Sequence, residues 1–219
     1  ALHSFPTRSP SDLTVRIDDE VHTGTMIDVR ACECCGTDAA IIGGIPVVVY
    51  RDRSEDEVRD ISIAALAGSP KNMYVDNWII AGCPVNGPSI DAIGTSSVVA
   101  WYSAPENASI VHIAFRDGDV TGTPIQLSTS IMGRVDVVMI DEATAVACWL
   151  EPNDETAAVM LVTVHRDGTV TDRKQVASVS LSRNSGFPRI AKVGEGLLVV
   201  WTSIDRDKGL GSTIVPFAE

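Results

Sequence analysis

Cysteine is the residue whose spacing first suggests chemistry in this sequence. Three of the five cysteines lie within four positions, in the stretch RACECCGT (30–37), and a fourth follows in GCPVNGP (82–88). Four thiols of this kind could form two disulfides, form one disulfide and leave two thiols, bind zinc or copper, or act as a redox switch. Two disulfides would suit an exported protein, and the close spacing is unusual for structural zinc. The four residues are Cys32, Cys34, Cys35 and Cys83.

Arginine is the second residue type that suggests a site. The chain has 13 arginines and only 4 lysines, and a guanidinium group holds a carboxylate or phosphate through two parallel hydrogen bonds. These arginines either line a polar pocket for an anionic ligand, or pair with aspartates and join neighbouring structural repeats. The candidate ligand-binding residues are Arg30, Arg51, Asp52, Arg53, Arg59, Asn86, Arg134, Asp136 and Arg189.

Composition and charge exclude several classes of partner. The formal net charge of −12 argues against nucleic acid and anionic membrane surfaces, because both reward clustered lysine and arginine. No apolar run reaches the length of about 18 residues that a membrane helix needs, and residues 1–12 show no apolar signal-peptide segment. The four histidines lack metal-ligand spacing, and neither a G-x-S-x-G motif nor a phosphate-binding glycine loop occurs. No cofactor is expected.

A repeat of about fifty residues organises the chain. Four short apolar runs each end in an aromatic residue, and these residues are 51, 48 and 52 positions apart. A strand-rich unit that recurs at this spacing is typical of a β-propeller blade. The four runs are Val47–Tyr50, Val98–Trp101, Val146–Trp149 and Leu198–Trp201.

The segments around these runs predict a single all-β domain. Each run follows an apolar segment across a turn and precedes a third strand-like segment, and no amphipathic helix is evident. We therefore expect a β-propeller of four four-stranded blades, at about 30–80, 81–130, 131–180 and 181–219. Residues 12–18 (DLTVRID) read as a strand that completes the last blade and closes the ring. Alternatively, the four blades are half of a larger ring, and a homodimer is then possible.

The unusual motifs should gather at one end of the blades. Successive antiparallel strands alternate in direction, so the loop before the first strand and the loop between the second and third strands lie at the same end. These two loop classes hold the cysteines and the candidate arginines, whereas the other end carries plain turns. The mouth of the central channel on the loop side is therefore the expected binding site.

With these motifs in place, the chain resembles bacterial sialidase-like (BNR/Asp-box) β-propeller proteins, and in particular the C-terminal half of the exo-α-sialidase-like group. The resemblance rests on ACECCGTDAA, VVVYRDRSEDEVRDI, DNWIIAGCPVNGP, GRVDVV and SGFPRIA, in this order between residues 26 and 203. The Asp-box pattern survives as remnants at 115–123 and 165–171. The resemblance implies export, and therefore a periplasmic or secreted protein.

The resemblance also implies a carbohydrate-related function. A sialidase holds the substrate carboxylate with three arginines at the propeller mouth, and it uses a tyrosine nucleophile, a glutamate partner and an aspartate acid/base. Tyr50 matches the group's motif, and it also occupies the repeat position that tryptophan holds elsewhere. We expect a propeller that binds a glycan or small anionic ligand at the channel mouth. The alternatives are a glycoside hydrolase of the exo-sialidase type and a structural or assembly propeller without a small-molecule site.

Overall fold

The computed structural model of the 219-residue chain describes residues 14–17, 20–66, 68–204 and 209–217. The described part is built from antiparallel strands, and its two short helical turns are 3-10 in character: η2 (Pro105–Asn107) and η3 (Arg183–Ser185). An all-β chain was predicted, and this prediction is confirmed. In the described part, no helix has the length and apolar character needed to span a membrane.

Four antiparallel sheets follow one another along the sequence, and we call them the first to the fourth sheet. The first sheet holds β3 (Asp38–Ile42), β4 (Ile45–Arg51), β5 (Ile61–Ala65) and β6 (Lys71–Tyr74). The second holds β7 (Ser89–Ile93), β8 (Ser96–Ser103), β9 (Ile110–Asp117), β10 (Val120–Thr121) and β11 (Ile125–Thr129). The third holds β12 (Gly133–Met139), β13 (Thr144–Asn153), β14 (Thr156–His165) and β15 (Val170–Val179). The fourth holds β16 (Arg189–Val193), β17 (Gly196–Thr202) and β18 (Leu210–Pro216).

The sequence repeat corresponds to these sheets. Tyr50, Trp101, Trp149 and Trp201 all lie on the second strand of their sheets, and Trp101 and Trp149 are completely buried. In the first, second and fourth sheets, a two-residue turn that begins or ends in glycine joins the first two strands. Gly43 and Gly44 form one such turn with φ of +56° and +82°, as a tight hairpin requires.

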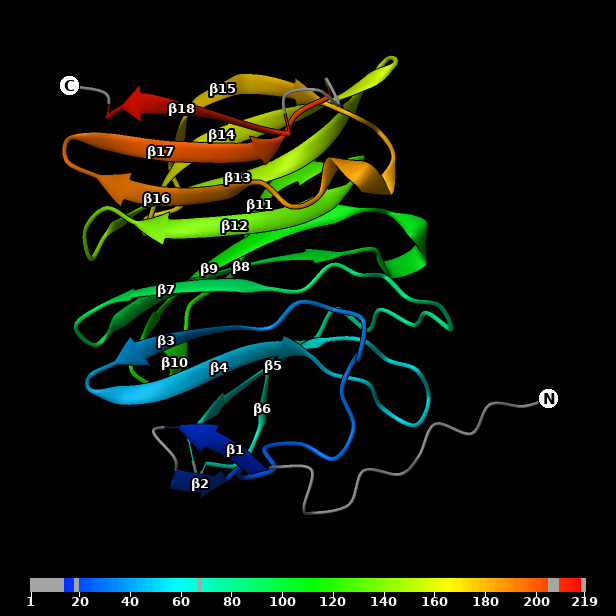
Figure 1. Ribbon diagram of the computed structural model, residues 1–219, viewed down its shortest axis with the longest axis vertical. Helices are drawn as coiled ribbons and strands as arrows, with labels where there is room; N and C mark the ends of the chain where they lie inside the picture. Colours follow the sequence, from blue (N-terminus) through cyan, green and yellow to red (C-terminus); the bar gives the residue numbers. More distant parts are fainter. Residues whose placement is uncertain (1–13, 18–19, 67, 205–208, 218–219) are drawn as a thin grey trace.

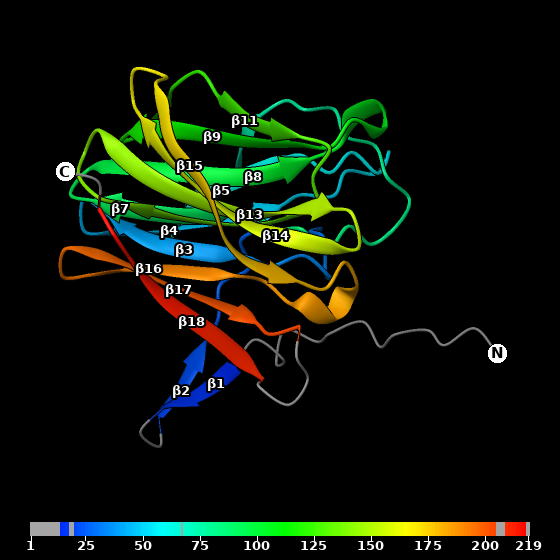
Figure 2. The same ribbon diagram turned by 90° about the horizontal axis from the view of Figure 1, so that it is seen from above.

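The sheets stack face to face, and side chains between them form the core (Figure 1). One apolar cluster joins the first and second sheets, one joins the second and third, and one joins the third and fourth. Figure 2, which looks along the stack, shows the strands of successive sheets rotated against one another. In the described part the outer faces of the first and fourth sheets have no further large sheet on them, so closure into a ring is not seen.

A repeated hydrogen bond joins the innermost strands. Asp38 on β3 accepts from the backbone N–H of Ile90 on β7 at 2.9 Å. Asp91 on β7 accepts from the N–H of Met139 on β12 at 2.7 Å. Asp136 on β12 accepts from the N–H of Ile190 on β16 at 2.8 Å. One aspartate from each of the first three sheets thus satisfies a backbone donor of the next sheet, which fixes the sheets' positions along the stack.

The segment expected to close the last blade has a different partner. Residues 14–17 form a strand, β1 (Thr14–Ile17), which pairs with β2 (Glu20–Thr23) in a separate hairpin. In Figure 1 this hairpin lies beyond the first sheet, at the far end of the stack from the fourth sheet. The fourth sheet has three strands in the described part. Residues 12, 13 and 18 of the expected strand lie outside the described residues, and the blade boundaries at 80, 130 and 180 stay predictions.

Candidate functional site

The two ends of the stack differ in their connections. The turns that join the first two strands of each sheet occupy one end. The longer loops, including η2 and η3, occupy the other end together with the short turn between β13 and β14, and we call it the loop end (Figure 1). All the candidate arginines and cysteines lie in or next to these longer loops. The structure therefore brings the predicted site residues to one end. There they form hydrogen bonds between sheets, ion pairs with Glu57, or disulfides.

Arg51 is the most buried of the candidate arginines, with 1% of its surface exposed. Its Nε donates to the carbonyl of Asn86 at 2.7 Å, and its Nη atoms donate to the carbonyls of Arg59 and Tyr102. The guanidinium also lies 4.8 Å from the centroid of the Trp78 ring. Burial lowers the pKa of Arg51 to about 10. Arg51 therefore joins the first and second sheets through three backbone carbonyls, and its side chain is buried rather than open to a ligand.

Arg134 plays the same role between the third and fourth sheets. It is 6% exposed, and it donates to the hydroxyl of Ser185, to the carbonyl of Gly186 at 2.9 Å and to that of Ser182 at 3.3 Å. The backbone N–H of Arg134 donates to Asn86 Oδ1 at 2.8 Å, and Asn86 Nδ2 donates to the carbonyl of Met132 at 3.1 Å.

A bulge in β12 makes these contacts possible. Gly133 and Arg134 have φ of +81° and +60°, in a register shift that precedes Asp136. A Cβ at Gly133 would lie 2.7 Å from the Asn86 amide and from the Tyr102 ring. Glycine is therefore required here, and the hydrogen bonds of Arg51, Asn86 and Arg134 form a continuous inter-sheet belt from the first sheet to the fourth.

The candidate aspartates also serve the fold. Asp136 is buried and accepts from Ser89 Oγ at 2.8 Å and from Arg189 Nη1 at 3.1 Å, and burial raises the pKa of its carboxyl. Asp52 accepts from the N–H of Arg53 at 2.6 Å and from Ser62 Oγ at 3.3 Å. The expectation that aspartates join neighbouring sheets thus describes Asp136, whereas Asp52 forms contacts within the first sheet.

Three candidate arginines converge on one glutamate that the sequence did not indicate. Glu57 binds Arg30 at 3.1 Å, Arg53 at 2.9 Å and Arg59 at 2.6 Å, and Arg53 also binds Glu33 at 3.1 Å. Hydrogen bonds from Arg53 and Arg59 lower the pKa of Glu57 to about 2. Each of these guanidinium groups is therefore paired with a carboxylate of the protein, which does not leave an open arginine clamp.

The cysteines form two disulfides, which is one of the alternatives that the sequence left open. Cys32 pairs with Cys35, and Cys34 pairs with Cys83. The second disulfide joins the loop before β3 to the loop before β7, so it links the first sheet to the second. The fifth cysteine, Cys148, is free and completely buried on β13, and burial raises the pKa of its thiol well above the usual value.

Tyr50 has the contacts of a packing residue. Only 4% of its surface is exposed, and its hydroxyl donates to Asp28 Oδ2 at 2.6 Å. Burial and the Asp28 carboxylate both raise the pKa of the Tyr50 hydroxyl. A nucleophilic tyrosine needs an accessible oxygen that loses its proton readily, and Tyr50 meets neither condition.

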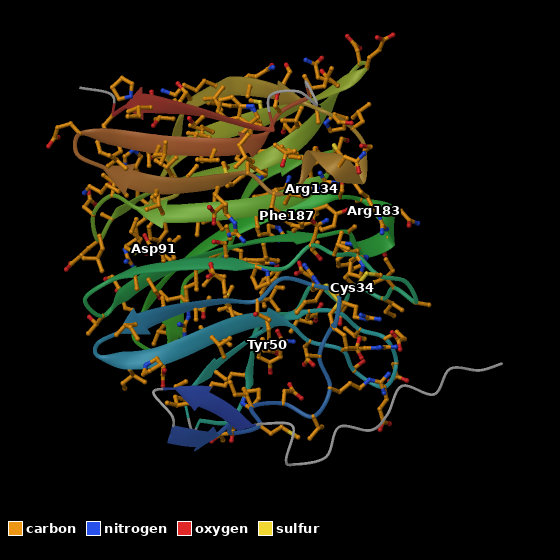
Figure 3. All side chains as sticks on the ribbon, viewed as in Figure 1. Cys34, Tyr50, Asp91, Arg134, Arg183 and Phe187 are labelled. Carbon is orange, nitrogen blue, oxygen red and sulfur yellow. A yellow bond between two sulfur atoms is a disulfide. The ribbon has the colours of Figure 1, made fainter. Side chains whose placement is uncertain are left out.

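One surface at the loop end keeps exposed side chains that a ligand could reach. Phe187 is 40% exposed, and the guanidinium of Arg134 lies 5.8 Å from its ring centroid. Arg183 on η3 is exposed and close enough to lower the pKa of Arg134, after burial, the larger cause. The Arg189 side chain is 63% exposed. We call Phe187, Arg183 and Arg189 the loop-end surface; Figure 3 shows Phe187 and Arg183 beside Arg134, with Asp91 toward the hairpin end.

The candidate residues from the sequence include Arg189 of this surface but not Phe187. The loop SRNSGFPR (182–189) carries an aromatic residue between two arginines. Gly186, with φ of +60°, would place a Cβ 2.6 Å from Thr202 Oγ1. Glycine there lets the loop pack closely on β17, and Phe187 follows at the point where the chain turns outward.

Comparison with known proteins supports the fold. No family model matches the chain, and no curated protein matches it in sequence. A fungal lectin from Aleuria aurantia with a six-bladed β-propeller fold is 13% identical, with 91% of this chain and 69% of the lectin covered and a TM-score of 0.56. A neuraminidase-like protein from A/bat/Guatemala/164/2009 is 10% identical, with 86% and 55% covered and a TM-score of 0.52.

A third neighbour, a thermostable family-43 glycoside hydrolase, is 9% identical, with 84% of this chain and 72% of the hydrolase covered and a TM-score of 0.50. All three are β-propellers. Identities this low establish the fold alone. The chain therefore has a β-propeller type of architecture, built from four antiparallel sheets in the described part.

Proposed function

We propose that this protein is a sialidase-like β-propeller that binds a glycan carrying an acidic sugar at the loop-end surface and does not hydrolyse it. The observation that carries the proposal is the exposed ring of Phe187 in a loop that also presents the exposed side chains of Arg183 and Arg189. An aromatic ring offers a flat apolar face to a sugar ring, and an arginine binds a sugar carboxylate through two hydrogen bonds.

The inter-sheet belt supports this site by holding its base rigid. Arg134 lies beneath Phe187, and its side chain is fixed by hydrogen bonds to the η3 loop. A ligand would therefore meet a preformed surface and would order few side chains on binding, which reduces the entropic cost of association.

The contacts of Tyr50 and of the candidate arginines at the loop end favour binding over hydrolysis. Tyr50 is buried and bonded to Asp28, and the arginines expected to clamp the substrate carboxylate are bonded to backbone carbonyls or to Glu57. One solved propeller of similar fold, the lectin from Aleuria aurantia, is described as fucose-specific, so a propeller of this kind can serve as a binding module. Two disulfides support a periplasmic or secreted location, because disulfides persist in oxidising compartments.

Binding to immobilised glycans tests the proposal. We expect the protein to bind sialylated glycans better than the matching neutral glycans, and we expect Phe187→Ala and Arg183→Gln to weaken that binding. Leu181→Ala, an exposed substitution in the same loop, is the matched control and should bind as the wild type does. Equal binding to neutral and sialylated glycans would contradict the proposal, and so would turnover of a fluorogenic sialoside.

A second candidate function, assembly with a second copy of the chain, is favoured by the outer face of the fourth sheet. Leu198 on β17 pairs with Ile214 on β18, and Ile214 is 62% exposed while Leu198 is half-buried. A further sheet would cover these apolar side chains in the way that the inner faces are covered. A native mass spectrum should then show a dimer that Ile214→Asp dissociates, and a wild-type monomer at every concentration would exclude this role.

A further inference from the structure

A cleft of about 580 Å³ lies between the first and second sheets at the hairpin end, far from the loop-end surface. Its floor is apolar and is formed by Ile42, Val47 and Ile63 of the first sheet. Its rim carries Lys71 and Asp119, which are both largely exposed and 3.5 Å apart. The volume falls in the range of sites for small molecules.

A buried arginine lines this cleft. Arg116 on β9 is only 5% exposed, and its Nε donates to Thr121 Oγ1 at 3.1 Å. Within the ranges that the structure describes, no other hydrogen bond or ion pair of this side chain is found. A guanidinium group has five N–H donors, so most of the hydrogen-bonding capacity of Arg116 is unused at a site where burial lowers its pKa.

A buried hydroxyl group without a hydrogen-bond partner among the described residues lies beside Arg116. Ser97 on β8 is directly opposite Arg116 in the strand register, so both side chains leave the same face of the second sheet. Ser97 is completely buried, and within the described part of the chain its hydroxyl has no hydrogen-bond partner. A buried hydroxyl without a partner is costly to the fold. Beside it, Arg116 lines the cleft with donors that bind no protein group in the described part, so the pair points to a ligand.

The sequence repeat shows that the fold does not need these polar residues. When Trp101 of the second sheet is aligned with Trp149 of the third, the pair Ser97 and Arg116 corresponds to the pair Ala145 and Val164. Ala145 and Val164 are fully buried in the apolar cluster that faces the second sheet. Apolar side chains therefore fill the corresponding positions of the third sheet, so packing alone does not require a serine and an arginine at these positions.

The next cleft along the stack provides a contrast. Arg166 lines the space between the second and third sheets, but its donors are occupied by the carbonyl of Glu142 at 2.7 Å and by Asp117 at 3.1 Å. The stretch RDG occurs at both 116–118 and 166–168, yet only the first copy places its arginine inside the strand and leaves the guanidinium group open.

We propose that the cleft between the first and second sheets binds a small monocarboxylate with an apolar body, and that Arg116 holds the carboxylate while Ile42, Val47 and Ile63 pack against the apolar part. The guanidinium fork matches the two oxygens of a carboxylate. Asp119 and Lys71 pair with each other on the rim, so Arg116 is the one unpaired charge of the described lining, and a singly charged carboxylate matches it better than a phosphate dianion. This site is independent of the glycan site, because its residues lie at the opposite end of the sheets.

Hexanoate is a suitable probe, with 1-hexanol and inorganic phosphate as comparators. Titration of the ¹⁵N-labelled protein should give saturable shifts of the Arg116 Nε signal and of β9 amides with hexanoate, and much weaker effects with the comparators. The double variant Ser97→Ala/Arg116→Val, which copies the pair of the third sheet, should bind hexanoate about tenfold or more weakly. Arg166→Val, in the neighbouring cleft, and Phe187→Ala, at the loop end, should bind it as the wild type does.

Thermal melting separates binding from a structural role. Without ligand, the double variant should melt no lower than the wild type, because it replaces buried polar groups by apolar ones. If the double variant fails to fold, Arg116→Lys provides a second test. Lysine keeps the positive charge but cannot form two parallel hydrogen bonds to a carboxylate, so this variant should still bind hexanoate more weakly. The proposal is overturned by a wild type that does not bind hexanoate, by equal affinity for 1-hexanol, by tighter binding of phosphate, or by unchanged affinity in Arg116→Lys.

Discussion

Replacing Arg51 by methionine is expected to destabilise the protein strongly without touching a ligand site. The side chain is 1% exposed and donates to three backbone carbonyls from different parts of the first and second sheets. Each buried carbonyl that loses its donor costs about 1–3 kcal/mol, so the loss for three is roughly 3–9 kcal/mol. Removing the buried charge recovers part of the desolvation cost. The net loss of unfolding free energy is therefore about 3–5 kcal/mol.

Urea unfolding followed by tryptophan fluorescence, with the disulfides intact, measures this loss as a lower midpoint at an unchanged slope. Arg53→Met is the matched control, because Arg53 lies two positions away and its ion pairs are at the surface, where such pairs contribute little. If the unfolding free energy falls by less than about 1 kcal/mol in Arg51→Met, or falls equally in the control, the inter-sheet belt does not stabilise the fold.

Three further predictions follow from single contacts. Replacing Cys34 and Cys83 by serine removes a disulfide with a sequence separation of 49 residues, and it should lower the unfolding free energy by about 4 kcal/mol in the same urea assay. Glu57→Gln should lower stability at neutral pH, and the difference from the wild type should shrink below the ordinary pKa of 4.5 and vanish near pH 2, because the folded state lowers that pKa. Cys148 should not react with a thiol reagent in the native protein and should give one thiol per chain in urea, since it is the free cysteine and is fully buried.

Each of these has a result that would contradict it. Stability unchanged by the loss of the Cys34–Cys83 disulfide would mean that the two loops hold together without it. A difference between wild type and Glu57→Gln that persists undiminished at pH 2 would mean that the arginine contacts do not set the titration. More than one reactive thiol in the unfolded, unreduced chain would show that the disulfides are incomplete.

Much of the fold followed from the sequence because its signals are local. The aromatic residues at a spacing near fifty, and glycines such as Gly43 and Gly94 at two-residue turns, mark strands and hairpins independently of their neighbours. Closure of the ring depends on the pairing of distant segments. The strand at residues 14–17 pairs with its immediate neighbour rather than with the fourth sheet, and a propensity argument does not distinguish these partners.

The functional roles were harder to predict, because they depend on where a side chain finds its partners. Arg51 and Arg53 are two positions apart, yet one meets carbonyls of another sheet and the other meets Glu57. The RDG stretch at Arg116 reads as a turn, and only the strand register shows that its side chain faces a cleft beside Ser97. The residue type shows that an arginine can donate hydrogen bonds. Only the fold shows whether those donors bind groups of the protein or stay free for a ligand.

Isothermal titration calorimetry with 3′-sialyllactose tests the central claim most directly, with lactose as the neutral comparison. We expect the wild type to release heat on binding sialyllactose, and we expect Phe187→Ala to lose most of that affinity. At the end of the titration the calorimeter's sample cell should contain no cleavage product. No binding by the wild type, or equal affinity in Phe187→Ala, would contradict the loop-end surface as the glycan site. Release of free sialic acid would contradict a binding function without hydrolysis.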